Sequence, residues 1–272
     1  MIESRDLLIY LAVKYDGDYS SIIHAAQDRI DPSVAEVEEC IKKVKSKVLT
    51  YFDEEYPAYL RKSPYPPLVL FYYGDISLIS DENYQKNVAV IGTRKPTDYG
   101  INATETIVKG IAAKYNVVSG LASGIDGIAQ TMAILSGGKT IAVLGSGIER
   151  VYPTENVDLY HNIINSGGLV VSEYPGYVEP FGGHFLIRNR IIAQLSKGVI
   201  VTEAYGRSGT SNTVTYAAMF GRDVLAVPSP VTALDSFTNQ LLYEGAIFIR
   251  NAKDVLDYFD SLYKPKRLVL KY

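Results

Sequence analysis

The stretch NVAVIGTRKPTDYG, residues 87–100, passes from a continuously apolar run directly into a glycine, a threonine and an arginine. Apolar, β-branched runs of this kind are typical of strands that are covered on both faces of a parallel sheet. A tight turn after such a strand uses the glycine and accommodates the proline, but it has no need of a cation. We therefore predict a buried strand that brings Arg94 to a phosphate.

The same alternation of a short apolar run and a helix-like run continues along the chain. The later apolar runs, each followed by a run with helical periodicity, are NVVSG, KTIAVLG, GLVVSE, GVIVTEA and DVLAVPS. Repeated units of strand and helix build a parallel sheet with helices on both faces. We therefore predict an α/β fold with a doubly wound, mostly parallel sheet.

The first 50 residues differ from this pattern and are predicted to form a small N-terminal helical segment. Behind an Asp-Pro cap signal, apolar residues recur at helical spacing: Val34, Val37, Ile41, Val44 and Val48. A connector rich in proline and tyrosine then leads into a short strand at residues 68–73. The expected organisation is a helical segment at 1–50, the main domain at 51–262 and a C-terminal tail at 263–272.

The composition excludes several classes of protein. With 27 basic and 30 acidic residues the formal net charge is −3, so any nucleic acid must bind at a local patch. Cys40 is the only cysteine, which excludes a disulfide framework and favours a cytoplasmic setting. Three scattered histidines lack zinc-ligand spacing, and the apolar runs are strand-sized. We therefore expect no metal, no membrane span and no signal peptide.

Five glycine-containing loops follow the predicted strands and should meet at one edge of the sheet, where ligands bind. They are GTRKPTDYG, SGLASGIDG, GSGIERVYP, SEYPGYVEPFGGHF and EAYGRSGTS. Glycine lets backbone N–H groups approach a phosphate, and the helix N-termini that follow favour an anion. One such loop is ordinary turn chemistry. Five on one edge, two of them presenting Arg94 and Arg207, indicate an anionic ligand.

Two near-motifs are not cofactor sites. In SGGKT, residues 136–140, the lysine opens a strand, whereas a P-loop lysine opens a helix. In GSGIER, Arg150 replaces the third glycine of the dinucleotide fingerprint, and the motif follows the third strand instead of the first. We therefore expect no cofactor.

The helix start FGGHFLIRNRIIAQL places Phe185, Arg188 and Asn189 on one face, together with a core-facing isoleucine. An aromatic ring beside a cation suits a stacked base with a phosphate near Arg188. In the alternative interpretation, Phe185 belongs to the core and Arg188 pairs with a carboxylate, either Glu173 or Glu203.

Glu173 and Glu203 each end a predicted strand and have two possible roles. They could act as a general acid and base, or they could hold Arg188 or Arg190 in place through ion pairs. Because no nucleophile or third orienting group accompanies them, we favour the ion pairs and expect that the protein is not an enzyme.

These motifs together resemble the DNA-processing protein A (DprA, or Smf) family. The resemblance covers residues 53–259 and rests on pieces that occur in the family's order and spacing: VAVIGTRKPTDYG, VVSGLASGIDGIAQ, KTIAVLGSGIERVYPTEN, SEYPG, FLIRNRIIAQLSKGVIVTEAYGRSGT and GRDVLAVP. It implies an extended Rossmann-like fold that binds single-stranded DNA, forms a homodimer, protects incoming DNA and helps to load a RecA-type recombinase during transformation.

The resemblance also implies a set of DNA-binding residues. Carried over onto this sequence, they are Gly92, Thr93, Arg94, Ser119, Gly120, Gly124, Phe185, Arg188, Asn189, Arg190, Arg207, Ser208 and Gly209. Ser123 and Gly182 stand where the family often has basic residues. Each lost cation removes a phosphate contact, so we expect weaker and less salt-dependent binding than is usual in the family.

Two other functions suit a similar fold. A nucleotide hydrolase of the phosphoribohydrolase (LOG-like) type carries a glutamate where this chain has Thr213, which leaves the acid/base role without an occupant. A nucleotide sensor or carrier would use the same glycine loops.

Overall fold

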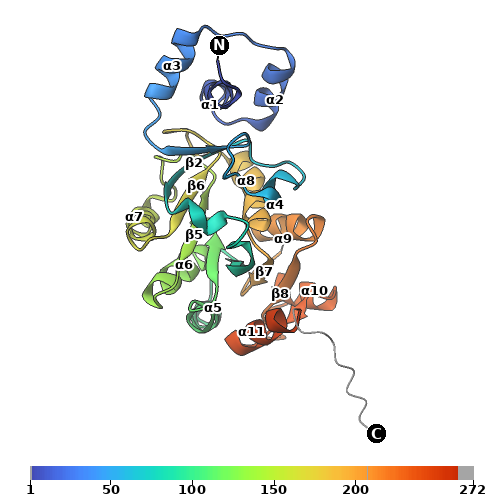
Figure 1. The fold of residues 1–272 in the computed structure, drawn as a ribbon. Coiled ribbons are helices and arrows are strands. Elements are labelled where there is room, and N and C mark those ends of the chain that lie inside the picture. Colours follow the sequence, from blue (N-terminus) through green and yellow to red (C-terminus); the bar gives the residue numbers. More distant parts are fainter. Residues whose placement is uncertain (1, 207, 263–272) are drawn as a thin grey trace.

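The computed structural model describes residues 2–206 and 208–262 (Figure 1). The predicted site residue Arg207 and the predicted tail at 263–272 lie outside the described residues. In the part of the chain that is described, no helix is both long and apolar enough to cross a bilayer.

A nine-stranded sheet forms the centre of the molecule, in the order β1-β2-β6-β5-β4-β3-β7-β8-β9. All neighbours from β6 to β9 are parallel, whereas β1 and β2 are antiparallel to each other, and β2 is antiparallel to β6. The predicted fold class is therefore confirmed. The strands are β1 (Lys47–Thr50), β2 (Val69–Gly74), β3 (Asn87–Ile91), β4 (Asn116–Ser119), β5 (Thr140–Leu144), β6 (Leu169–Ser172), β7 (Gly198–Val201), β8 (Asp223–Ala226) and β9 (Ile247–Phe248).

Helices cover both faces of this sheet (Figure 1). The α-helices are α1 (Ser4–Lys14), α2 (Tyr19–Gln27), α3 (Val34–Lys42), α4 (Ala58–Arg61), α5 (Asp98–Ile111), α6 (Ile125–Leu135), α7 (Val157–Asn165), α8 (Gly182–Gln194), α9 (Gly209–Met219), α10 (Phe237–Tyr243) and α11 (Ala252–Ser261). Short 3-10 turns are η1 (Ile76–Ile79), η2 (Tyr84–Lys86) and η3 (Thr154–Asn156).

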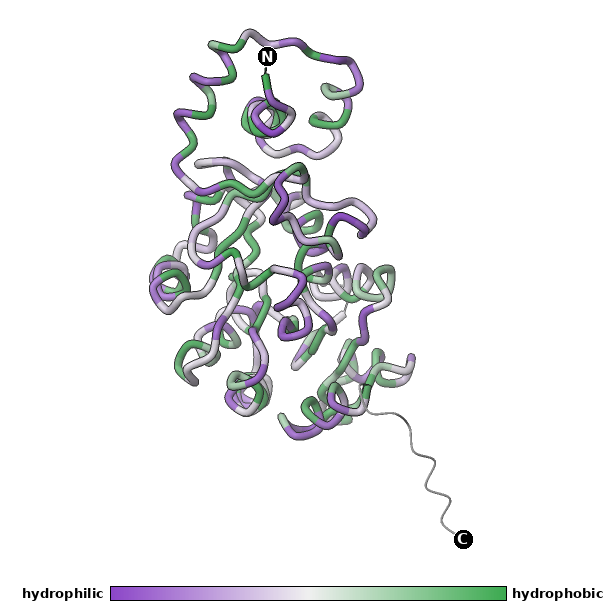
Figure 2. Tube along the Cα trace, viewed as in Figure 1, coloured by the Kyte–Doolittle hydropathy of each residue, from purple (hydrophilic) through white to green (hydrophobic). Residues whose placement is uncertain are grey.

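Alternate residues of each strand supply the two cores, because successive side chains of a strand point to opposite faces. In β3, Val88 and Val90 pack with α5, α6 and α11, whereas Ala89 and Ile91 pack with α8, α9 and α10. Figure 2 shows the hydrophobic residues gathered along the strands and on helix surfaces that face them. The strands are therefore covered on both faces, as their continuous hydrophobicity predicted.

The N-terminal helices α1, α2 and α3 pack on the sheet through a third cluster that includes Phe71 and residues of α7. The predicted helical stripe is wrong beyond Ile41, because α3 ends at Lys42 and Val48 lies in β1 opposite Phe71. Pairing with β2 satisfies the backbone of this β-branched segment and overrides its helical spacing. Part of the segment predicted at 1–50 therefore belongs to the central sheet.

Candidate nucleic-acid interface

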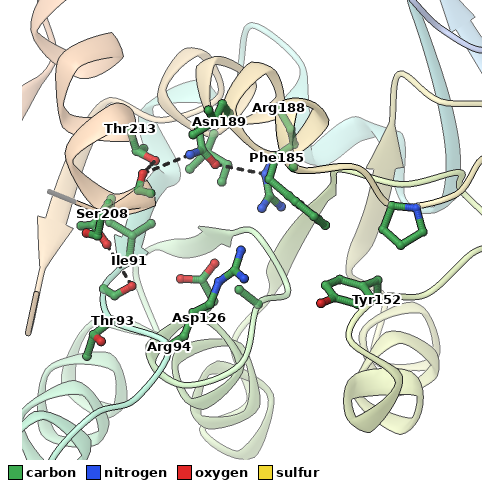
Figure 3. Close-up of a pocket in the computed structure, with 18 of the residues that line it drawn as sticks. Ile91, Thr93, Arg94, Asp126, Tyr152, Phe185, Arg188, Asn189, Ser208 and Thr213 are labelled. Atoms are coloured by element: carbon green, nitrogen blue, oxygen red, sulfur yellow. Dashed lines mark hydrogen bonds between the residues drawn. The ribbon is translucent and has the colours of Figure 1, made fainter.

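A cavity of about 710 Å³, which we call the Arg94 pocket, opens at the carboxyl ends of the parallel strands, beside the first turns of α8 and α9 (Figure 3). The predicted residues that line it are Gly92, Thr93, Arg94, Phe185, Arg188, Asn189, Ser208 and Gly209. Ser119, Gly120, Gly124 and Arg190 are not among its lining residues. Three segments that are far apart in the sequence therefore meet where the sequence predicted a common edge.

The loop after β3 is held by close backbone packing. The Thr93 N–H donates to the Glu203 carbonyl at 2.8 Å, and the Ile125 N–H donates to the Thr93 carbonyl at 3.1 Å. A Cβ at position 92 would lie 2.5 Å from the Glu203 carbonyl oxygen, so only glycine fits there. Gly124 has φ +76°, a conformation that favours glycine, and a Cβ there would meet the Thr93 carbonyl at 2.4 Å. These two glycines fix the path of the loop.

Arg94 extends from this loop and is exposed. Its guanidinium lies 5.6 Å from the centre of the Phe185 ring, and Figure 3 shows it reaching into the hollow. Among the described residues, no carboxylate lies within ion-pair distance of Arg94. The side chain is therefore available to an anionic ligand.

Phe185 is half-buried, so the structure combines features of both interpretations of this residue. One side of its ring packs so closely on Gly145 that a Cβ there would lie 2.5 Å from Phe185 Cδ1. The Tyr152 ring lies 5.5 Å away, tilted by 35°. The ring also lines the Arg94 pocket, so part of it is available to a ligand.

Arg188 is buried and binds the ends of two neighbouring strands. Its Nη1 donates to the Gly120 carbonyl at 2.6 Å and to the Val143 carbonyl. A Cβ on Gly120 would lie 2.5 Å from this nitrogen, so Gly120 makes room for the guanidinium. Burial lowers the pKa of Arg188 to about 10, and the nearby Asp126 carboxylate opposes that shift. The alternative pairing of Arg188 with Glu173 or Glu203 is wrong.

Asp126, which the sequence analysis missed, is the carboxylate at the base of the pocket. Burial raises its pKa, whereas Arg188 and the Gly120 N–H, which donates at 2.9 Å, favour the charged form. Asp126 follows Ser123 by three residues in a loop that was predicted at this edge of the sheet. Its position in the sequence could therefore have identified it as a pocket residue.

Arg190 and Glu173 form a buried, bidentate ion pair. Nη1 and Nη2 of Arg190 each donate to a carboxylate oxygen of Glu173 at 2.6 Å. Burial acts to lower the pKa of Arg190, but the Glu173 charge and hydrogen bonds raise it. The predicted role of Glu173 as an ion-pair partner is confirmed, and the pair joins α8 to the end of β6.

Glu203 has a different role from the predicted one. Its carboxylate accepts from the Thr97 N–H at 2.8 Å, the Thr97 hydroxyl at 2.6 Å and the Tyr205 hydroxyl at 2.6 Å. The hydrogen bond from Tyr205 raises the pKa of that phenol to about 12. Glu203, at the end of β7, therefore fastens the start of α5 and the loop that carries Arg94. It does not contact an arginine in the described chain.

The N-terminus of α9 opens into the pocket. Ser208 is its N-cap residue but makes no side-chain cap, and its buried Oγ has no hydrogen-bond partner among the described residues. A Cβ at Gly209 would meet open space. Asn189 links α8 to this turn by donating to the Gly209 carbonyl at 3.1 Å. Free N–H groups at a helix N-terminus attract anions.

The remaining predicted positions are structural or uncharged. The Ser119 hydroxyl is buried and donates to the Val90 carbonyl at 2.7 Å. The Ser123 hydroxyl donates to Glu155 at 2.6 Å, and Gly182 borders the pocket with open space beside it. The pocket also includes Tyr152, whose loop was predicted at this edge although the residue itself was missed.

The fold and the site together define a Rossmann-like α/β protein with a pocket at the carboxyl edge of its sheet that presents an exposed arginine. The family model for DNA recombination-mediator protein A matches residues 47–260. The chain therefore belongs to the DNA recombination-mediator protein A family, in which DprA and Smf proteins are its relatives.

Two curated relatives illustrate the similarity. Protein Smf of Synechocystis is 40% identical over 210 residues, which cover 76% of this chain and 52% of that protein. The DNA processing protein DprA of Streptococcus pneumoniae is 40% identical over 209 residues, which cover 76% of this chain and 72% of that protein. The match thus spans about half the length of the Synechocystis relative.

Two solved structures are also similar. DNA processing protein A from Streptococcus pneumoniae superposes with a TM-score of 0.76 and 33% identity, over 93% of this chain and 92% of that chain. DNA processing protein A from Helicobacter pylori superposes with a TM-score of 0.71 and 30% identity, over 82% of this chain and 99% of that chain. The latter structure concerns that protein's single-stranded DNA binding mode.

Removing the Glu173 charge tests the anchoring of α8. In Glu173→Gln, Arg190 is left as a buried charge without a counter-ion, and we expect unfolding to become easier by about 3–5 kcal/mol. Urea denaturation measures this loss. Glu179→Gln is the control, because Glu179 pairs with Arg150 at the exposed surface and its loss should be much smaller. Equal effects in the two variants would contradict the anchoring role.

Replacing the Phe185 ring by a branched side chain separates stacking from packing. In Phe185→Leu we expect binding of single-stranded DNA to weaken by about 1–3 kcal/mol. The free energy of unfolding should fall by about 1.5 kcal/mol or less, because apolar volume is largely kept. Fluorescence anisotropy and thermal melting measure the two quantities, with Ile187→Ala as an exposed control on the same helix. A stability loss with unchanged affinity would leave Phe185 a packing residue only.

Proposed function

We propose that this chain is a non-catalytic single-stranded DNA-binding protein that acts as a recombination mediator. In this proposal it is a homodimer that protects incoming DNA during uptake and transformation and loads a RecA-type recombinase. Its family membership and the single-stranded DNA binding described for the Helicobacter pylori protein support the first part. The second part of the proposal concerns the protein's biological role. It includes the recombinase, the dimer and transformation.

One observation carries the DNA-binding role. Arg94 lies over the half-buried ring of Phe185 and has no counter-ion among the described residues. Both residues line a pocket that the N-terminus of α9 also borders. A cation and free backbone N–H groups suit phosphates, and an aromatic face suits a base of any sequence. Neither feature reads base identity. Binding should therefore be electrostatic and tolerant of sequence.

The engagement of the strand-end glutamates supports a non-catalytic role. Glu173 is bound to Arg190, and Glu203 is bound to Thr97 and Tyr205. Thr213 lines the pocket where nucleotide hydrolases of similar fold carry a glutamate. Its hydroxyl cannot serve as a general base near neutral pH.

Exposed apolar side chains near α10 support self-association. Val231, Leu234 and Tyr243 are each more than nine-tenths exposed. Val231 and Leu234 lie in the loop before α10 and Tyr243 ends that helix, and exposed apolar side chains mark protein interaction surfaces where they form a patch. This surface is the candidate for the homodimer contact.

Strand selectivity tests the proposed function. We expect single-stranded oligonucleotides to bind more tightly than duplexes of the same sequence, because a stacked base must be unpaired. Anisotropy titrations with matched strands at several salt concentrations measure this difference. Competition by mononucleotides tests the nucleotide-carrier alternative, which the pocket volume accommodates. Equal affinity for duplex, or full competition by a mononucleotide, would overturn the proposal.

Arg94 is expected to make one phosphate contact. Arg94→Ala should weaken binding to a similar extent for all sequences and lower the slope of log affinity against log salt by about one. The control is Arg250→Ala, since Arg250 is exposed and pairs with Asp254 beside α11. An unchanged slope in a folded Arg94→Ala protein would assign Arg94 a structural role.

A further inference from the structure

A second hollow lies behind the loop that carries Tyr152, between the α3–β1 segment and α7. It consists of two cavities, of about 820 and 590 Å³, that share Lys45, Glu149 and Tyr177. We call it the Tyr177 groove. One end reaches His184 and Ser46, and the other reaches Tyr73 and His161. In Figure 1 the elements that border it, α3, β2 and α7, lie on the same side of the molecule.

A run of lysines passes along this groove, and two of them, Lys43 and Lys45, line it. Four of the six residues in the sequence KKVKSK are exposed lysines, namely Lys42, Lys43, Lys45 and Lys47. Of these, only Lys43 has a carboxylate partner within the described ranges, an exposed pair with Glu39. So many cations held in six residues create a local positive potential on a chain whose net charge is −3.

Three carboxylates also line the groove, and one of them is paired with a cation. Glu149 accepts from the Tyr73 hydroxyl at 3.2 Å, and Glu179 pairs with Arg150 at 3.1 Å. Asp16 is the third carboxylate in the lining, at the end near His184. Glu149 and Asp16 keep their charges, so the positive potential of the groove comes from the lysine run on its α3–β1 side.

Aromatic side chains lie among these cations. Tyr177 is 64% exposed, and Lys45 Nζ lies 5.8 Å from the centre of its ring. Tyr73 is half-buried, and His161 is exposed in the middle of α7. Proteins that bind single strands combine a cationic groove with exposed rings on which bases of any kind stack.

Two buried polar atoms in the groove also lack partners. The Oγ of Ser46, a residue only 9% exposed, and the Nδ1 of His184 make no hydrogen bond with any described residue. Both residues belong to the groove lining. Buried polar atoms are nearly always satisfied, so an ordered water molecule or a polar ligand completes their hydrogen bonding.

The loop that carries Tyr152 separates the groove from the Arg94 pocket, because Val151 and Thr154 line the groove whereas Tyr152 lines the pocket. The Gly147 N–H donates to the Val178 carbonyl at 2.8 Å, and the Glu149 N–H donates to the Gly176 carbonyl at 2.9 Å, so the two loops form one wall. Tyr152 lines the pocket on one side of this wall, and Tyr177 lines the groove on the other. A strand that leaves the pocket over Tyr152 has only this wall to cross.

We propose that the Tyr177 groove binds the continuation of the single-stranded DNA held in the Arg94 pocket, with the lysine run contacting its phosphates and Tyr177 stacking on a base. This inference rests on the proposed function. Lys42, Lys43 and Lys45 precede the residues that match the family model. The chain's own N-terminal segment thus lengthens the DNA path.

The test compares short and long oligothymidylates, of about 6 and about 20 nucleotides, chosen to fill one site or to extend beyond it. The variant replaces Lys42, Lys43, Lys45 and Lys47 by glutamine. Affinity for the long strand should fall about tenfold, and its salt slope should decrease by about two to three. Affinity for the short strand should stay within about twofold, because the Arg94 pocket is unchanged.

A charge-matched control replaces four exposed lysines outside the groove by glutamine, Lys62, Lys86, Lys109 and Lys253. It should keep the long-strand affinity. Tyr177→Ala should weaken binding of the long strand but not of the short strand. If the fourfold lysine variant unfolds, the single variants Tyr177→Ala and Lys45→Gln replace it. Thermal melting monitors folding.

The outcomes separate the two proposals. If the wild-type protein binds neither strand, the proposed function is wrong. If it binds the short strand but the lysine variant binds both strands as the wild type does, the groove proposal is wrong. Equal losses for both strands, or an equal loss in the matched control, would also overturn it by showing a general charge effect.

Discussion

Two nearby arginines of α8 hold together the carboxyl ends of three central strands, and the rest of the site depends on them. Arg188 donates to the carbonyls of Gly120 and Val143, at the ends of β4 and β5. Arg190 forms a bidentate pair with Glu173 at the end of β6. Charge-assisted bonds of this kind are strong and directional. They set the position of the first turn of α8, and therefore of the pocket wall.

Because these arginines are engaged inside the protein, the pocket depends on other groups for anion binding. Arg94 is exposed, the α9 N-terminus is uncapped by Ser208, and the rim has no cation at Ser123 or Gly182. Besides Arg94, only Lys95 brings an exposed cation to the described lining, and a pocket with so few exposed charges suits a ligand that also stacks. It also gives a reason for further cations along the path of a long polymer, since each phosphate contact adds to affinity.

Burial explains where the sequence was informative about the site and where it was not. Glycine loops, Arg94 and Phe185 could be assigned to one sheet edge because strand order alone brings strand ends together. The partners of Glu173 and Glu203 could not be assigned, because the sequence alone does not show which arginine lies near which carboxylate. Only the packing of α8 on the sheet chose Arg190 for Glu173 and left Glu203 to Thr97.

The sequence by itself determined the doubly wound sheet, because continuous apolar strands and periodic helices require burial on both faces. It also determined which loops meet, since that follows from parallel strand direction. The tertiary structure decided that Val48 is in a strand, since pairing with Phe71 is a long-range contact that helical spacing does not register. It likewise decided that Arg188 faces inward while Arg94 faces solvent, because a guanidinium is buried only where carbonyls and carboxylates from distant segments converge on it.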